Sequence, residues 1–480
     1  MAKNNLNVTS KFYITTTIPY ANAPPHIGFA LEIVQADAIA RWHRQKKENV
    51  FFLTGTDEHG SKIYKTAKTF KMDVKKFVDE NSEYFKKLTK GLNISNDFFI
   101  RTTDKKVHWP GVINIWKKLE NKGDIYKKKY IGKYCSGCER FVTEKDLVNG
   151  KCVNHPNIEI EELSEENYFF KLSKYSKKII ELIKKDKLKI FPQQWKNDFL
   201  GLVKDGLQDV SFSRDVKYLP WGIPVPSDKN QVMYVWCDAL TNYLTGIGYP
   251  NKKYEKYWPA DIHVVGKDML RFHAGIWPGM LLSAGLALPK KIIVHGFLTV
   301  GGHKMSKSLG NVISPLELLK KYDSDSIRYT LFRATPFGQD GDFSEKALID
   351  RHNNELADKL GNLVSRVSAL IERVGSPTRP PAGNKLIKKL NVKKIQELFD
   401  NFEFDKVLNE IFGFIDVCNE YVQSKKPWET GDKKILYELK ESILKIAELL
   451  WPFIPESSEK ITKQFSATKI KKSEILFKKI

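Results

Sequence analysis

Residues 301–311 read GGHKMSKSLGN, and residues 25–29, far upstream, read PHIGF. The first stretch places two lysines and two hydroxyls in a glycine-flanked loop, which suits a mobile clamp on a charged triphosphate. The second stretch follows an extended segment, residues 11–18, and precedes an apolar-periodic segment, residues 30–42, that we expect to be helical. Because N–H groups at the start of a helix bind phosphate oxygens, the two stretches predict a nucleotide site.

The two stretches resemble the paired signatures of class I aminoacyl-tRNA synthetases, His-Ile-Gly-His and Lys-Met-Ser-Lys-Ser. Residues 304–308 match the second signature in full, whereas Phe29 stands where the first has its last histidine. Small nucleotidyltransferases share the first signature, but they lack the second and are far shorter than this chain. The alternative is that Lys304 and Lys307 form a solvated basic turn and that His26 is an ordinary turn residue.

Length and charge limit the number of domains and the kinds of partner that the chain can have. The 480 residues predict two or three domains, and 79 Lys and Arg against 57 Asp and Glu give a net charge of +22. This charge suits a polyanionic partner such as RNA, although a lysine-rich compositional habit explains it equally well. The N-terminus has no apolar signal core and no apolar stretch reaches about 18 residues, so we expect a cytoplasmic protein that does not enter a membrane.

The cysteines indicate a metal site. Five cysteines are too few and odd in number for a disulfide framework, and three of them lie close together. Cys135 and Cys138 form one pair with two-residue spacing, and Cys152 and His155 form another. Two such turns supply a tetrahedral thiolate and imidazole set for one structural zinc ion, with no open position for chemistry. The alternative is reduced, unliganded cysteines in a loop; the cluster resembles the zinc knuckle in the connective insertion of methionyl-tRNA synthetases.

The order of elements predicts a Rossmann-like parallel α/β domain, an insertion, and an all-α helical bundle. Short β-branched runs bounded by turns predict strands at residues 12–17, 50–53, 232–236, 262–265 and 292–294. Helical periodicity replaces strand signals beyond about residue 344. We therefore expect a catalytic domain in two halves, at residues 1–114 and 215–302. The connective insertion with the zinc knuckle, at residues 115–214, separates these halves. A signature-loop and stem-contact segment follows at residues 303–343, and a helical anticodon-binding domain at residues 344–480.

Four further segments resemble the amino-acid pocket of methionyl-tRNA synthetases: residues 18–22 (IPYAN), 54–60 (TGTDEHG), 234–240 (YVWCDAL) and 266–273 (GKDMLRFH). A thioether needs an aromatic and aliphatic slot with one or two weak polar contacts. The resemblance implies that Asp57 pairs with the substrate ammonium, although a turn or N-cap aspartate is the simpler explanation of Asp57 alone. The methionine-binding residues that it implies are Ile18, Tyr20, Asp57, Trp236, Ala239, Leu240, Tyr243 and His273; without the resemblance, such aromatic residues are more often core.

The resemblance also implies the reaction. The carboxylate of methionine attacks the α-phosphorus of ATP, with which Mg²⁺ binds, and the acyl group then passes to the terminal ribose of tRNA(Met). No covalent enzyme intermediate is required, so positioning and charge stabilisation carry the catalysis. The catalytic residues implied are His26, Gly28, Lys304, Lys307 and Arg214. The ATP-binding residues implied are His26, Gly28, Glu32, Gly266, Asp268, His295, Lys304 and Lys307. For Arg214 and Glu32 the alternative is a surface ion pair.

Residues 362–366 (NLVSR) and 419–428 (NEYVQSKKPW) look like the anticodon-reading segments of the same family. Trp428, just after a proline, would offer an exposed face for stacking a base, and Asn362 and Arg366, one helical turn apart, would reach base edges. A capped and salt-bridged helix is the alternative for the last two. The chain ends soon after this bundle, so we expect no appended domain and a monomer.

Two other functions stay open from the sequence. One is a class I synthetase for another apolar amino acid, although such enzymes carry a much larger editing insertion. The other is a non-catalytic tRNA-binding paralogue, which Phe29 makes conceivable.

Overall fold

The computed structural model describes residues 10–137, 140–142, 144–305, 310–472 and 474–480. Its contacts divide the chain into two compact units. Unit 1 comprises Met1–Pro25, His43–Lys87 and Asn96–Val294, and unit 2 comprises His26–Trp42, Leu88–Ser95 and His295–Ile480. Each unit is therefore assembled from segments that lie far apart in the sequence.

Unit 1 is built on a six-stranded sheet in the order β3-β2-β1-β14-β15-β9. β1 pairs in parallel with β2 and β14, β2 with β3, and β15 with β9. Most residues of the central strands are buried, as expected where helices cover both faces of a parallel sheet. The strands are β1 (Lys11–Thr15), β2 (Asn49–Thr56), β3 (Phe98–Arg101), β9 (Lys189–Phe191), β14 (Ile262–Gly266) and β15 (Lys291–His295).

Four of the five predicted strands belong to this sheet, whereas the one predicted at residues 232–236 is a strand only as far as Met233 and belongs to another sheet. The chain forms β13 (Asp228–Met233), turns at Tyr234, and continues as the helix α7 (Val235–Leu240). A short apolar run that is buried on all sides has the same composition in a strand and in a core helix, which explains the error. β13 pairs antiparallel with β11 (Ser213–Asp215) and β12 (Pro224–Val225) in a separate three-stranded sheet.

The segment predicted as the connective insertion contains a long antiparallel pair, β4 (Ile125–Cys135) and β8 (Ile160–Phe170). β5 (Arg140–Phe141) and β10 (Val210–Ser211) extend this pair to four strands, and β6 (Leu147–Val148) pairs with β7 (Lys151–Cys152). β9 lies within the predicted insertion by sequence, yet it forms an edge of the six-stranded sheet.

Helices complete unit 1. The longest is α3 (Val74–Gly91), whose last turn belongs to unit 2. The others are α2 (Ser61–Thr69), α4 (Trp109–Asn121), α5 (Ser176–Lys184), α6 (Gln193–Leu202), α8 (Asn242–Thr245) and α9 (Trp277–Ala284).

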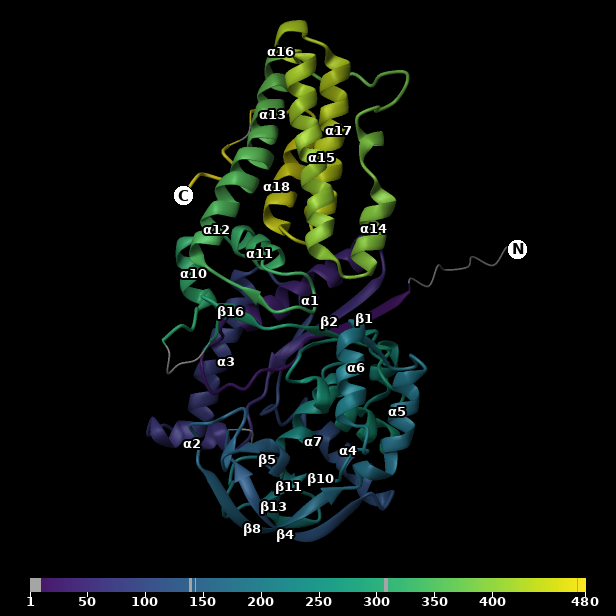
Figure 1. Cartoon of the computed structure of the whole chain (residues 1–480). Coiled ribbons are helices and arrows are strands. Elements are labelled where there is room, and N and C mark those ends of the chain that lie inside the picture. Colours follow the sequence, from purple (N-terminus) through teal and green to yellow (C-terminus); the bar gives the residue numbers. More distant parts are fainter. Residues whose placement is uncertain (1–9, 138–139, 143, 306–309, 473) are drawn as a thin grey trace, which may run out of the picture. The chain divides into compact units, whose positions relative to one another are not determined.

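Unit 2 combines the helix α1 (Ile27–Gln45), a small sheet and a helical part, which comprises the helices from α10 to α18 within residues 315–465. Figure 1 shows α13 (Asn362–Val374), α15 (Phe404–Lys425) and α17 (Lys433–Leu450) running side by side, and they contact one another. The apolar positions that predicted α17, such as Leu436, Leu439 and Ile443, are buried. No strand follows residue 342 in the part of the chain that the structure describes, so the predicted helical bundle is confirmed.

The small sheet of unit 2 has the order β17-β16-β18 and comprises β16 (Leu298–Val300), β17 (His303–Lys304) and β18 (Gly341–Asp342). The remaining helices of unit 2 are α10 (Pro315–Lys321), α11 (Ser324–Arg333), α12 (Glu345–Arg351), the π-helix η6 (His352–Gly361), α14 (Val392–Asp400), α16 (Pro427–Thr430) and α18 (Pro455–Phe465). Among the described helices of both units, none combines the length and apolar character needed to cross a bilayer.

Candidate active site

The two signature segments meet in unit 2. His26 immediately precedes α1, and its carbonyl accepts N–H groups from Phe29 and Ala30 at 3.0 and 3.3 Å. A Cβ atom placed on Gly28 would lie 2.9 Å from Cε1 of His26 and 3.7 Å from Cε of Met305. Glycine therefore keeps the backbone open where the first signature faces Met305 of the second.

His26 has an exposed side chain with a defined hydrogen-bond role. Its Nδ1 accepts the N–H of Gly28 at 3.1 Å. Because an accepting ring nitrogen carries no proton, the neutral ring bears its proton on Nε2. The sequence thus builds a helix start whose imidazole can donate from Nε2 to a phosphate oxygen.

The turn before the second signature is made by two glycines. Gly301 and Gly302 have φ values of 61° and 75°, which L side chains rarely adopt, and they join β16 to β17 as a two-residue hairpin. Asp342 of β18 holds the turn by accepting the Gly302 N–H at 2.9 Å and the Thr299 hydroxyl at 2.6 Å. These bonds, the one from Thr299 foremost, lower the pKa of Asp342. Lys304 ends β17, and Lys307 lies outside the described residues.

Glu32 and His295, two predicted ATP-binding residues, form a buried pair in unit 2. Nε2 of His295 lies 2.9 Å from Oε2 of Glu32, and Nδ1 lies 2.7 Å from the carbonyl of Gly296. Both ring nitrogens of His295 thus face oxygen atoms, one of the Glu32 carboxylate and one of the backbone. This arrangement fixes the Glu32 carboxylate on the first turns of α1.

The predicted methionine-binding residues lie in unit 1. Trp236 stacks on Phe272, with ring centroids 3.6 Å apart, and Nε2 of His273 lies 2.7 Å from the Tyr243 hydroxyl. Nδ1 of His273 lies 2.9 Å from the Met269 carbonyl and so carries the ring proton, which leaves Nε2 to accept from Tyr243. Ile18, Ala239 and Leu240 are buried in the same hydrophobic cluster as Trp236 and Tyr243.

Asp57 follows β2 directly and is only 3% exposed. Its backbone forms a parallel bridge with Tyr20, because the Asp57 N–H donates to Pro19 at 2.9 Å and the Asp57 carbonyl accepts from Ala21 at 2.8 Å. Oδ1 of Asp57 accepts the N–H of His59 at 3.3 Å. The bridge therefore holds two of the predicted methionine-binding residues, Tyr20 and Asp57, at neighbouring positions.

Unit 1 also contains three residues predicted for ATP binding or catalysis, namely Gly266, Asp268 and Arg214. Gly266 ends β14 and its carbonyl accepts the Met269 N–H, while Asp268 between them is exposed. The guanidinium of Arg214 lies 3.7 Å from the centre of the Tyr234 ring, and Nη1 donates to the Ser213 carbonyl at 2.7 Å. Arg214 is only 5% exposed, and these contacts are with an aromatic ring and a backbone carbonyl, so they do not match the surface ion pair given as its alternative.

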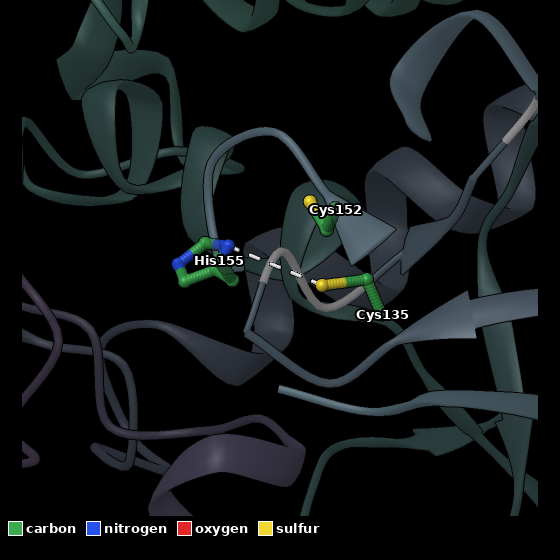
Figure 2. A group of neighbouring side chains, drawn as sticks. All are labelled: Cys135, Cys152 and His155. Carbon is green, nitrogen blue, oxygen red and sulfur yellow. Dashed lines mark hydrogen bonds between the residues drawn. The ribbon is translucent and has the colours of Figure 1, made fainter. Parts of the chain in front are cut away.

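Three of the four predicted metal ligands converge, as Figure 2 shows for Cys135, Cys152 and His155. Their ligand atoms all lie within 4.8 Å of one another, and Sγ of Cys135 lies 4.0 Å from Nδ1 of His155. A Cβ on Gly137 would lie 2.5 Å from Cγ of His155, so glycine is needed for this close turn. Cys138 lies outside the described residues. Two sulfur donors and one imidazole fit the ligand preference of zinc.

The predicted anticodon residues lie in the helical part of unit 2. Asn362 and Arg366 are both exposed on α13, and the Asn362 amide donates to the Asp358 carbonyl at 2.9 Å. Trp428 is the second residue of α16, which begins at Pro427, and it is half-buried rather than fully exposed. Nη2 of Arg373, also on α13, donates to the Trp428 carbonyl at 2.9 Å, which links the two candidate segments.

Comparison with known families decides the class. The sequence profile described as "tRNA synthetases class I (M)" matches residues 12–162 and 137–368, and that of the "Anticodon-binding domain of tRNA ligase" matches residues 386–479. The chain belongs to the methionyl-tRNA synthetase family. The "Methionine--tRNA ligase" of Caldanaerobacter subterraneus subsp. tengcongensis is 42% identical over 98% of this chain and 79% of its own length, and that of Brucella suis is 40% identical over 94% and 91%.

Solved structures of the family agree with this assignment. The Mycobacterium tuberculosis methionyl-tRNA synthetase in complex with methionyl-adenylate has a TM-score of 0.89 at 37% identity, covering 95% of this chain and 94% of its own. A second structure of that enzyme bound by methionyl-adenylate has a TM-score of 0.91 at 35% identity, covering 98% and 100%. The predicted fold, a Rossmann-like sheet followed by a helical anticodon-binding region, is thus confirmed for this synthetase.

One buried cluster of this synthetase was not predicted from the sequence. Asp238 accepts from His59 at 2.6 Å through Oδ2 and lies 2.8 Å from Nε2 of His108 through Oδ1, and none of the three side chains is appreciably exposed. Burial alone would raise the pKa of Asp238, but the two histidines lower it below its usual value. His59 and Asp238 lie within the segments that resemble the pocket, whereas His108 lies in none of them, so only the fold brings it to Asp238.

Proposed function

We propose that this chain activates L-methionine with ATP to form methionyl-adenylate and pyrophosphate, and then transfers methionine to the 3′ end of tRNA(Met). The observation that carries the proposal is the approach of Met305 to Gly28, which joins the two class I signatures in one unit. Family membership and the likeness to two structures that contain methionyl-adenylate support it. The predicted domain boundaries at residues 114, 214, 302 and 343 are part of the proposal.

In this reaction the methionine carboxylate attacks the α-phosphorus, and the bond to the β,γ-diphosphate breaks. We assign His26 and Gly28 to the phosphates, because Nε2 of His26 is a donor and Gly28 adds no side chain in the way of a phosphate. Lys304 and Lys307 would stabilise the charge that develops on the leaving pyrophosphate, and Mg²⁺ bound with ATP would neutralise part of it. The other proposed ATP-binding residues are Glu32, Gly266, Asp268 and His295, with Arg214 as a further catalytic residue.

For the amino acid, we propose that Asp57 binds the ammonium group and that the buried aromatic cluster holds the thioether. The Tyr243 hydroxyl, bonded to His273, is the polar group best suited to a weak contact with sulfur. The apolar walls of the thioether site would be supplied by Trp236, Ile18, Ala239, Leu240 and Tyr20. Shape and one polar contact discriminate against other apolar side chains by about 1–3 kcal/mol per feature.

We further propose one structural zinc ion held by Cys135, Cys152, His155 and Cys138. Three of these donors already converge. Because a four-ligand zinc site has no open position, the ion would stabilise the fold of the insertion and take no part in the reaction. In the helical part, Asn362, Arg366 and Trp428 are the proposed anticodon contacts. A cytoplasmic monomer remains our expectation.

An amino-acid screen of ATP–pyrophosphate exchange tests the proposal. Exchange that depends on methionine supports it, and exchange with another apolar amino acid would assign the chain to a different class I specificity. A folded protein that binds tRNA but supports no exchange would be a non-catalytic paralogue. A second assay, transfer of labelled methionine to tRNA(Met), tests the later step.

A further inference from the structure

Helix α1, which carries the first ATP signature, is joined to the helical part of unit 2 by a buried ion pair. Oδ2 of Asp37 lies 2.8 Å from Nη2 of Arg328 on α11, and both side chains are fully buried. The same oxygen accepts Nε of Arg41 at 2.8 Å. Oδ1 of Asp37 accepts the N–H and the hydroxyl of Ser95 at 2.7 and 2.6 Å, so both oxygens are bonded.

Arg328 also bonds to the turn between α17 and α18. Nε of Arg328 donates to the Phe453 carbonyl at 2.8 Å and Nη2 to the Pro452 carbonyl at 2.8 Å. Nη1 donates to the Leu92 carbonyl at 3.0 Å. One planar guanidinium therefore fixes α1, the segment 88–95 and the end of the helical part in a single geometry, which a lysine ammonium cannot reproduce.

Two aromatic contacts reinforce the same end of α1. Trp42 stacks on Phe399 of α14 at 4.3 Å between ring centroids, and its indole N–H donates to Asp400 at 3.2 Å. The guanidinium of Arg41 lies 4.8 Å from the centre of the Trp451 ring. The second half of α1 thus packs on the helical part at three successive sites.

The first half of α1 carries Glu32, and His26 immediately precedes the helix. Glu32 lies five residues before Asp37, about 7.5 Å along the axis, and Ile27, the first residue of α1, lies about 15 Å away by the same count. Because a helix behaves as a rod over this length, a shift or rotation at Asp37 also displaces His26 and Glu32. A displacement of about 1 Å at reacting groups can cost about 10²-fold in rate.

We propose that Arg328 is a positioning residue through which the helical part sets the ATP-binding end of α1. The inference deepens the proposed function and rests on it for the assignment of His26 and Glu32 to ATP. The proposed methionine-binding residues lie in unit 1, which contains neither Asp37 nor Arg328. ATP binding should therefore depend on Arg328, and methionine binding should not.

Arg328→Lys tests this in the full-length protein, because it keeps the charge and removes the planar fork. We expect the KM for ATP in methionine-dependent exchange to rise about tenfold or more, with the dissociation constant for methionine within about twofold of wild type. Arg333→Lys is the matched control, since Arg333 lies on the same helix and bonds to Glu355 and Asp405 in the helical part. The control should change neither constant.

Trp451→Leu is a second variant for the case in which Arg328→Lys does not fold. It removes the ring contact with Arg41 at a partly exposed position and should also weaken ATP without weakening methionine. An unchanged ATP affinity in a folded Arg328→Lys or Trp451→Leu protein, or a parallel loss of both affinities, would overturn the proposal. Calorimetric titration with a non-hydrolysable ATP analogue gives the ATP affinity even if wild type lacks exchange activity, a result that would refute only the proposed function.

Discussion

Asp37 and Arg328 form an ion pair, 2.8 Å between Oδ2 and Nη2, from which solvent is fully excluded. Burial disfavours the ionised form of Asp37, but Arg328 and Arg41 outweigh it, so the pKa of this carboxyl lies below its usual value. Desolvation of both charges makes such a pair a weak source of net stability while it is intact. Once one partner is removed, the other is left as an uncompensated buried charge.

Asp37→Asn should therefore destabilise the protein by about 3–5 kcal/mol, measured by urea denaturation, because Arg328 and Arg41 lose their counter-ion. Lys346→Ala is the control; its partner Asp350 is a surface residue, so the change should stay within about 0.5 kcal/mol. Because the pKa of Asp37 is lower in the folded state, its contribution to stability is fully present above the unfolded-state pKa of about 3.9. This contribution is lost as the pH falls through the lower pKa of the folded state. Equal stability of Asp37→Asn and wild type at pH 7 would contradict this account.

Tyr243→Phe should raise the KM for methionine about tenfold and leave the KM for ATP unchanged. The substitution removes the hydroxyl proposed to contact the thioether sulfur, a feature worth about 1–3 kcal/mol, and with it the donor to Nε2 of His273. Pyrophosphate exchange at varied methionine measures the effect. Tyr249→Phe is the matched control, because the Tyr249 hydroxyl bonds to Asn114 instead. A rise in the KM for ATP alone would remove Tyr243 from the proposed methionine pocket.

Cys152→Ser should abolish the binding of zinc, which wild type should hold at about one equivalent per chain by elemental analysis. A serine hydroxyl is a poor ligand compared with the thiolate that Cys152 places beside Cys135 and His155. Faster hydrogen exchange should follow in β4 and β8, where the insertion is stabilised. Cys418→Ser, at a buried cysteine of α15, should keep the metal. Zinc retained in full by Cys152→Ser would show that other residues hold it.

Some strands of the sheet could be predicted from the sequence and others could not. The strands at residues 262–265 and 292–294 were predictable because short runs rich in β-branched residues between turns fit buried parallel strands. Residues 232–236 have a similar composition, and only the turn at Tyr234 separates a strand from a helix there. Local pattern therefore predicts that a segment is core more reliably than it predicts which element the segment forms.

Side-chain pairs that are distant in the sequence could not be predicted, for a different reason. Asp238 joins His59 and His108, which precede it by 179 and 130 residues, and Asp37 precedes its partner Arg328 by 291 residues. Such pairings depend on how the elements pack, which a single sequence does not encode as a local signal. The signatures and the pocket segments were identifiable because the chemistry of ATP and methionine constrains residue types within short stretches.

Phe29→His should preserve or raise the rate of methionine-dependent exchange. Phe29 lies in the first turn of α1 and is largely buried, and the new imidazole would add a second potential donor near the phosphates. Phe29→Leu keeps an apolar side chain and should leave the rate unchanged if Phe29 only fills space. A large loss in both variants would show that the phenyl ring has a role of its own.

Trp428→Ala should raise the KM for tRNA(Met) in methionine transfer about tenfold, since a stacked base is worth about 1–3 kcal/mol, and it should leave pyrophosphate exchange intact. The matched variant Trp428→Phe keeps an aromatic face and should retain most of the affinity. Arg373 holds the Trp428 carbonyl, so both variants keep the backbone contact that joins α16 to α13. An equal loss of exchange and transfer in Trp428→Ala would mean that the substitution disturbs the helical part as a whole, and base stacking would then be the wrong explanation.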